Sequence, residues 1–130
     1  MLVNLSVEQA QVFVLSSAMK FENFEEFWSF YMNEHSKPAT RWVHFVGTMT
    51  FNVLAVLAIC LDWRIIFLGL VLGYGLAWFS HFFIEMNRPA SFKHPIWSAI
   101  ADEKMVLLML TRKMDRELRR LQKRPAYNFD

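Results

Sequence analysis

Two long uncharged runs dominate the pattern of hydrophobic and polar positions along the chain. The first covers residues 42–61 and the second residues 65–84, and neither contains Asp, Glu, Lys or Arg. Each run has about 20 residues, which as a helix would be roughly 30 Å long, the thickness of the hydrocarbon core of a bilayer. The pattern therefore predicts two transmembrane helices.

A short polar turn, Asp62 to Arg64, separates the two runs. A turn of this length makes the two helices antiparallel and places both chain termini on one side of the membrane. Of the 14 Lys and Arg residues, only Arg64 lies in the turn, so the positive-inside rule predicts cytoplasmic termini. A buried hairpin in a soluble helical protein is the alternative, which the length of the runs disfavours.

Rows of residues spaced four apart predict which helix faces meet. Gly69, Gly73 and Ala77 form a row of small residues that leads to His81, and such residues let a neighbouring helix approach closely. The first helix has a polar row at the same spacing, formed by Thr40, His44, Thr48 and Asn52. Because polar groups are costly in lipid, we expect the two rows to face each other.

Interfacial helices are predicted before the hairpin. Ser6 and Gln9 have the spacing of a helix-capping box, and so do Asn23 and Glu26. Two short helices are therefore expected within residues 7–34. The second has an aromatic face suited to the membrane interface or to packing against the hairpin.

An ordered loop and one further helix are predicted after the hairpin. Residues 87–95 contain two prolines, and Asp102 is the expected cap of a C-terminal helix at about 102–123. Four basic residues of that helix lie in one row: Arg112, Arg116, Arg120 and Arg124. This row could bind the anionic headgroups of lipids. A solvated helix face with salt bridges is an equally good alternative. The acidic residues between the basic ones argue against nucleic acid as a partner.

Composition agrees with a membrane protein of one domain. The 130 residues are 55% hydrophobic and only 20% charged, which is apolar for a soluble domain of this size. The single cysteine, Cys60, excludes an intramolecular disulfide. We therefore predict an all-α integral membrane bundle over residues 1–130, with a central transmembrane hairpin at 42–84 and flanking interfacial helices.

The four histidines are predicted to gather at one end of this hairpin. With Trp63 as the tip, His44 lies 19 residues before it and His81 lies 18 after it, so antiparallel helices place both at one depth. His35 and His94 fall just beyond the same two helix ends. Neutral imidazole is a common ligand of first-row metals, so four histidines together favour one metal site over four separately hydrogen-bonded rings.

Charged residues near the histidines are candidates for the chemistry. Glu34, Glu85 and Asp102 can each accept a hydrogen bond from a metal-bound imidazole or bind the metal directly. Arg41 and Arg88 frame the site, and a guanidinium suits a carboxylate or phosphate headgroup, with interfacial snorkelling as the alternative. Histidine ligands leave iron and zinc open, although two histidines with one carboxylate are typical of non-haem iron oxygenases.

The most specific stretch of the chain, residues 81–98, reads HFFIEMNRPASFKHPIWS. Together with aromatic, arginine and histidine positions between about 24 and 105, it resembles the membrane 2-hydroxy fatty acid dioxygenase family, in a short bacterial form. The resemblance implies an iron(II)-dependent enzyme of fatty acid alpha-oxidation, acting in the degradation of phytosphingosine. It also implies that the histidines of the family correspond to His35, His44, His81 and His94.

The resulting hypothesis is a non-haem iron dioxygenase that removes one carbon from a long-chain 2-hydroxy fatty acid, using dioxygen and no organic cofactor. We expect the four histidines to bind the metal, and Glu85, Asn87, Arg41 and Arg88 to act in catalysis. The expected location is the bacterial inner membrane, or the endoplasmic reticulum in a eukaryote. A lipid-directed metalloenzyme of another kind, such as a zinc hydrolase, and a noncatalytic membrane scaffold remain as alternatives.

Overall fold

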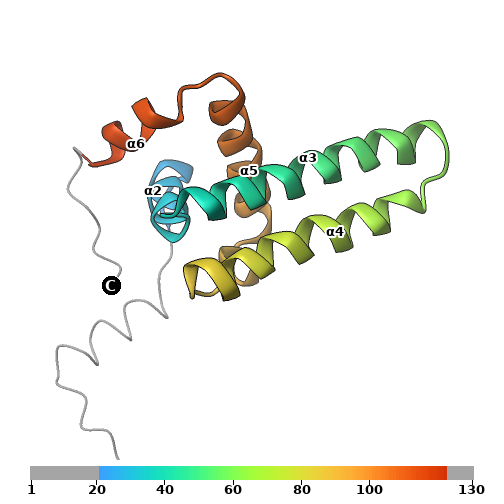
Figure 1. Ribbon diagram of the computed structural model, residues 1–130, viewed down its shortest axis with the longest axis horizontal. Coiled ribbons are helices and arrows are strands. Elements are labelled where there is room, and N and C mark those ends of the chain that lie inside the picture. Colours follow the sequence, from blue (N-terminus) through green and yellow to red (C-terminus); the bar gives the residue numbers. More distant parts are fainter. Residues whose placement is uncertain (1–20, 123–130) are drawn as a thin grey trace, which may run out of the picture.

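The computed structural model describes residues 21–122, which form helices and connecting loops (Figure 1). In chain order these are α2 (Phe24–Glu34), α3 (Pro38–Cys60), α4 (Ile65–Ser80), a π-helical segment (His81–Glu85), a 3-10 turn (Ala90–Phe92), α5 (Pro95–Leu110) and α6 (Met114–Gln122). The described residues contain no strand, and the predicted all-α fold is confirmed. The predicted first helix, before residue 20, and Arg124 lie outside the described residues.

Helices α3 and α4 form the predicted antiparallel hairpin, which extends away from the other helices (Figure 1). The 23 residues of α3 and the 21 residues from Ile65 to Glu85 are each long and apolar enough to cross a membrane. Only 17% of the most apolar window of each is buried within the protein. An apolar surface of this length suits a membrane, and the side of the membrane on which the termini lie stays a prediction.

Small residues bring α3 and α4 together. A Cβ added to Gly47 would lie 3.2 Å from the carbonyl oxygen of Gly73, and a Cβ added to Gly69 would lie 3.3 Å from the ring of Phe51. These separations leave little room for a larger side chain, as expected for close helix packing. The expectation that Gly69 and Gly73 of α4 face a neighbouring helix is confirmed, and that helix is α3.

Two members of the polar row of α3, His44 and Asn52, form hydrogen bonds with α5, whereas we expected the row to face α4. His44 Nδ1 lies 2.9 Å from Asp102 Oδ1, and Asn52 Nδ2 donates to Glu103 Oε2 at 3.1 Å. The residues of α3 that meet Gly69 and Gly73 of α4 are instead Gly47, Phe51 and Leu54. The reason is that α5 runs across the hairpin and brings carboxylates that can accept these hydrogen bonds (Figure 1).

The C-terminal region forms two helices, so the single helix predicted to begin at Asp102 is wrong. Helix α5 begins at Pro95, whose fixed φ suits a first helical turn, and Asp102 lies in its middle. The chain then breaks at Arg112, which has a φ of 57°, and α6 begins at Met114. The break carries no glycine or proline, which is why the hydropathy pattern ran across it. It also separates Arg112 from the rest of the predicted arginine row.

An aromatic core joins α2 to α5 at the base of the hairpin. Phe27, Trp28 and Tyr31 are at most 1% exposed and pack with Met105 of α5. Aromatic side chains of this size bury about 150–250 Å² each, so they supply most of the apolar burial outside the hairpin. The predicted cap of α2 is confirmed, because Asn23 Oδ1 accepts from the amide of Glu26, three residues later, at 3.0 Å.

Helix α6 is fastened to α2 by charged side chains. Glu117 accepts a hydrogen bond from Trp28 Nε1 at 2.8 Å and also pairs with Arg120. Arg120 reaches Glu25 of α2 at 2.7 Å. The hydrogen bond from Arg120 holds the pKa of Glu117 down to about 2. Of the two alternatives for the basic residues, the salt-bridged face describes Arg120.

Candidate metal centre

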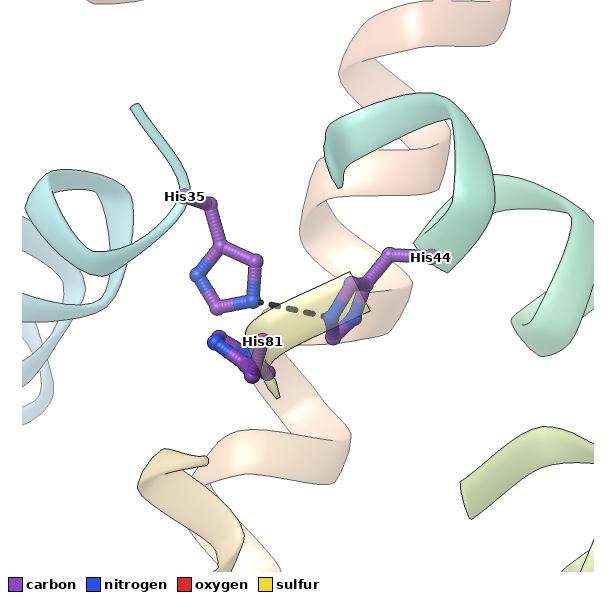
Figure 2. A group of neighbouring side chains, drawn as sticks. All are labelled: His35, His44 and His81. Carbon is purple, nitrogen blue, oxygen red and sulfur yellow. Dashed lines mark hydrogen bonds between the residues drawn. The ribbon is translucent and has the colours of Figure 1, made fainter. Parts of the chain in front are cut away.

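Three of the four histidines meet in one buried group where α2, α3 and the π-helical segment come together. Figure 2 shows the rings of His35, His44 and His81 turned toward one another. One ring nitrogen from each lies within 4.8 Å of the other two, and the Nε2 atoms of His35 and His44 are 3.2 Å apart. The three residues are at most 4% exposed. His44 and His81 thus lie at the same level of the hairpin, as predicted, with ring centroids 5.0 Å apart.

The hydrogen-bond partners of His35 and His44 determine which ring nitrogen carries the proton. His35 Nδ1 lies 2.6 Å from the carbonyl oxygen of Tyr31, which only accepts, so His35 Nδ1 is the donor. His44 Nδ1 lies 2.9 Å from the Asp102 carboxylate, which also accepts. Nδ1 of each ring therefore carries a proton, and Nε2 of a neutral ring offers a lone pair.

His81 is held in the same tautomer through Asn87. The amide nitrogen of Asn87 donates to Glu34 twice, to its carbonyl oxygen at 2.9 Å and to Oε2 at 2.8 Å. The amide oxygen of Asn87 is thereby directed to His81 Nδ1, 2.6 Å away. His81 Nδ1 is the donor of that bond, so its Nε2 is the third lone pair in the group.

This arrangement fits a metal cation. With the Nδ1 atoms of both rings donating to other partners, the Nε2 atoms of His35 and His44 are left facing each other 3.2 Å apart. Burial holds the pKa of His35 well below its ordinary value, and the nearby imidazoles lower it further, so the ring is neutral. Neutral imidazoles whose other nitrogen donates to a carboxylate or carbonyl are the usual ligands of zinc and iron. The same donors serve either metal, so metal identity stays open.

The π-helical segment explains how His81 and Asn87 come together. The amide of Asn87 bonds the carbonyl of His81 at 2.9 Å, and Met86 adopts a left-handed conformation with a φ of 60°. This wider turn ends the helix and folds the chain back so that Asn87 faces the ring of His81. Wide turns of this kind are frequent at functional sites.

The fourth histidine lies outside this group. His94 precedes α5 as its N-cap, and its ring packs among aromatic side chains, with centroid distances of 5.2 Å to Phe21 and 5.5 Å to Phe27. It also stacks on Trp97. Our sequence argument placed His94 only by its distance from the hairpin tip. The start of α5 at Pro95 instead carries it into the aromatic core.

The predicted catalytic residues Glu85 and Arg41 support the connection that carries His35. Glu85 accepts from Ser36 Oγ at 2.8 Å and from the amide of Lys37 at 2.5 Å, at the beginning of α3. Arg41 donates to the carbonyl oxygens of His35 and Ser36, each at 2.9 Å. Both side chains thus hold the turn between α2 and α3.

The other two predicted catalytic residues differ in their positions. Asn87 contacts His81 directly, as described above, whereas Arg88 is exposed. Asp102, considered in advance as a hydrogen-bond acceptor or a ligand, accepts from His44 and also from the hydroxyl of Tyr31. The catalytic assignments of these residues stay predictions.

Sequence reasoning missed Tyr31. Its ring stacks on His35 with centroids 3.9 Å apart, its carbonyl accepts from His35, and its hydroxyl donates to Asp102. Burial, followed by the nearby Asp102 carboxylate, raises the pKa of Tyr31, which keeps the hydroxyl protonated as a donor. The available signal was its spacing four residues before His35 on a predicted helix, where we counted it with the aromatic face and not with the site.

Two adjoining cavities lie at the histidines. The smaller, about 20 Å³, has room for a single water or ion, and its lining includes Tyr31, His35, His44, His81, Ser98 and Asp102. The larger, about 270 Å³, lies between α3, α4 and α5 and is lined mainly by apolar side chains, among them Phe51, Leu70 and Ile100. Both are lined by His44, Tyr74, Ala77 and Asp102, so the larger one leads directly to the histidine group.

Fold and site together define a helical protein with two membrane-length helices and a three-histidine group able to hold a metal ion. The sequence model of the family described as 2-hydroxy-palmitic acid dioxygenase Mpo1-like matches residues 21–114. The chain belongs to this family, which confirms the resemblance noted from the sequence. No curated protein and no solved structure matches the chain.

Proposed function

We propose that this protein is an iron(II)-dependent dioxygenase that shortens long-chain 2-hydroxy fatty acids by one carbon. The observation that carries the proposal is the convergence of three imidazoles whose Nδ1 protons are all committed to other partners. The name of the family adds the reaction class and a 2-hydroxy fatty acid as substrate. Iron and the removal of one carbon are the parts that experiment must test.

The cavities suggest how such a substrate would lie. The 2-hydroxyl would enter the small cavity beside the histidines, which has room for one such group, and the carboxylate and acyl chain would lie in the larger cavity that adjoins it. From His44 to Phe51 that cavity follows α3 for seven residues, or about 10 Å of helix. Its walls belong to the apolar hairpin, so a lipid substrate would reach it from the bilayer without crossing water. The cytoplasmic placement of this end follows from the positive-inside rule.

The protein would position the metal and the substrate and would exclude bulk water from the site. Iron(II), when bound, would supply a site for the polar head of the substrate and for dioxygen. The three histidines would hold it, and Asp102 and Asn87 would keep two of the rings in the required tautomer. Burial of the histidines excludes bulk water.

The overall reaction balances with dioxygen alone. One 2-hydroxy acid and one dioxygen give the acid one carbon shorter, carbon dioxide and water. All the electrons accepted by dioxygen come from the two carbons of the cleaved bond, so no separate reductant enters. This agrees with the expectation that no organic cofactor takes part.

Purified protein provides the test. The full chain in mild detergent should carry about one iron per protein by elemental analysis, and with 2-hydroxypalmitate it should consume dioxygen and release pentadecanoate. His81→Ala should abolish product formation, because it removes one of three ligands. Zinc without oxygen uptake would favour a hydrolase, and protein that binds no metal would favour a scaffold. Either result would refute the proposal.

A further inference from the structure

Ser98 carries a buried hydroxyl whose role the site described so far does not explain. Its side chain is 6% exposed, and its Oγ has no hydrogen-bond partner among the described residues. A serine within a helix usually donates to the carbonyl oxygen four residues earlier, which here belongs to His94. That carbonyl accepts from the backbone amide of Ser98 at 2.9 Å, and the Oγ of Ser98 forms no bond to it. A buried hydroxyl without a partner destabilises a fold, so it calls for an explanation.

The position of Ser98 supplies one. It lines the small cavity together with His35, His44 and His81. Asp102 lies one turn further along α5 on the same face and lines the same cavity. A polar group that entered this cavity to reach the histidines would therefore meet the free hydroxyl of Ser98.

We propose that Ser98 Oγ hydrogen-bonds the 2-hydroxyl group of the substrate and so selects 2-hydroxy acids over unsubstituted fatty acids. A hydroxyl both donates and accepts, and so complements a second hydroxyl. The carboxylate of the substrate is a poorer partner at this point, because it would approach the Asp102 carboxylate one turn away. This inference rests on the proposed function and adds the group that distinguishes the substrate.

Thr40 provides a matched control for Ser98→Ala. Its Oγ1 is also buried and without a partner among the described residues, and it lies one turn before His44 on α3. Thr40 does not line either cavity described above. Ser98→Ala and Thr40→Val each remove a hydroxyl that makes no hydrogen bond in the fold, so neither variant should have a lower Tm than the original protein.

The test compares the binding of 2-hydroxypalmitate and palmitate to the full chain in mild detergent, loaded with iron(II) and kept without dioxygen. The original protein and Thr40→Val should both prefer 2-hydroxypalmitate. Ser98→Ala should bind 2-hydroxypalmitate about 3- to 10-fold more weakly, the worth of one hydrogen bond, and palmitate equally well.

Two results would overturn the inference. If Ser98→Ala keeps the original preference, or weakens both acids equally, Ser98 does not read the 2-hydroxyl group. If the original protein itself distinguishes neither acid and consumes no dioxygen, the proposed function fails, and the role of Ser98 fails with it. The unchanged protein therefore separates the two kinds of failure.

Discussion

Replacement of Asp102 by asparagine should weaken metal binding without removing a ligand. Oδ1 of Asp102 accepts from both His44 Nδ1 and the hydroxyl of Tyr31. Asparagine keeps the size of the side chain but loses its charge. Hydrogen bonds to charged groups contribute about 1.5–3 kcal/mol and neutral ones about 0.5–1.5, so each bond should weaken by about 1 kcal/mol.

Two such bonds amount to about 2 kcal/mol, or roughly 30-fold in metal affinity at 1.4 kcal/mol per tenfold. This agrees with the 10- to 100-fold cost usual for outer partners of ligating histidines. Tyr31→Phe removes one of the two bonds entirely, about 1.5 kcal/mol at the low end of the range for charged groups, and should cost about tenfold. Affinity would be measured by competition of Co²⁺ or Fe²⁺ between the protein and a coloured chelator.

Glu103→Gln is the control for Asp102→Asn. Glu103 is the next residue along α5, is exposed, and accepts from Asn52 rather than from a histidine. Its substitution should leave metal affinity within about twofold. The reasoning is refuted if Asp102→Asn binds metal within threefold of the original protein, or if Glu103→Gln weakens it as much.

Three further predictions concern ligand number, pH and helix packing. His94→Gln should still bind about one metal ion per chain by elemental analysis, whereas His81→Gln should bind none. Loss of the metal from both variants would show that His94 is a fourth ligand. Glu117 has a folded pKa of about 2, below its ordinary 4.5, so its stabilisation is full above pH 4.5 and lost as the pH falls toward 2. The loss should be about 1–2 kcal/mol after solvent screening, and Glu117→Gln, followed by denaturant unfolding at several pH values, should show a smaller dependence. Gly47→Ala should destabilise the hairpin by roughly 1–3 kcal/mol, since its Cβ would lie 3.2 Å from a backbone oxygen, whereas Gly75→Ala, with open space around it, should be neutral or stabilising in thermal unfolding.

The hairpin and the meeting of two histidines followed from the sequence because they depend on helix geometry alone. Two uncharged runs of membrane length joined by a short turn fix both direction and depth, so His44 and His81 had to lie level. His35 was then placed correctly by its closeness to the end of the same run.

The remaining features depend on tertiary packing that no local pattern encodes. His94 was misplaced because its position is set by where α5 begins and by the aromatic core, not by its distance from the hairpin tip. Asp102 was a correct candidate as an acceptor, yet its place in the middle of α5 was missed. The way α5 crosses the hairpin decides that Asp102 meets His44 and that Asn52 of the polar row meets Glu103.

The histidine group joins α2 to the hairpin, which are otherwise linked by side-chain hydrogen bonds such as those of Glu85 and Asn87. His35 ends the short helix α2, and His81 follows the second long helix 46 positions later. A cation bound to both would act as a cross-link between α2 and the hairpin. At a free ion concentration 100 times the Kd, such a link adds about 2.7 kcal/mol to stability. A chelator that removes the metal would thus also weaken the attachment of α2 to the hairpin.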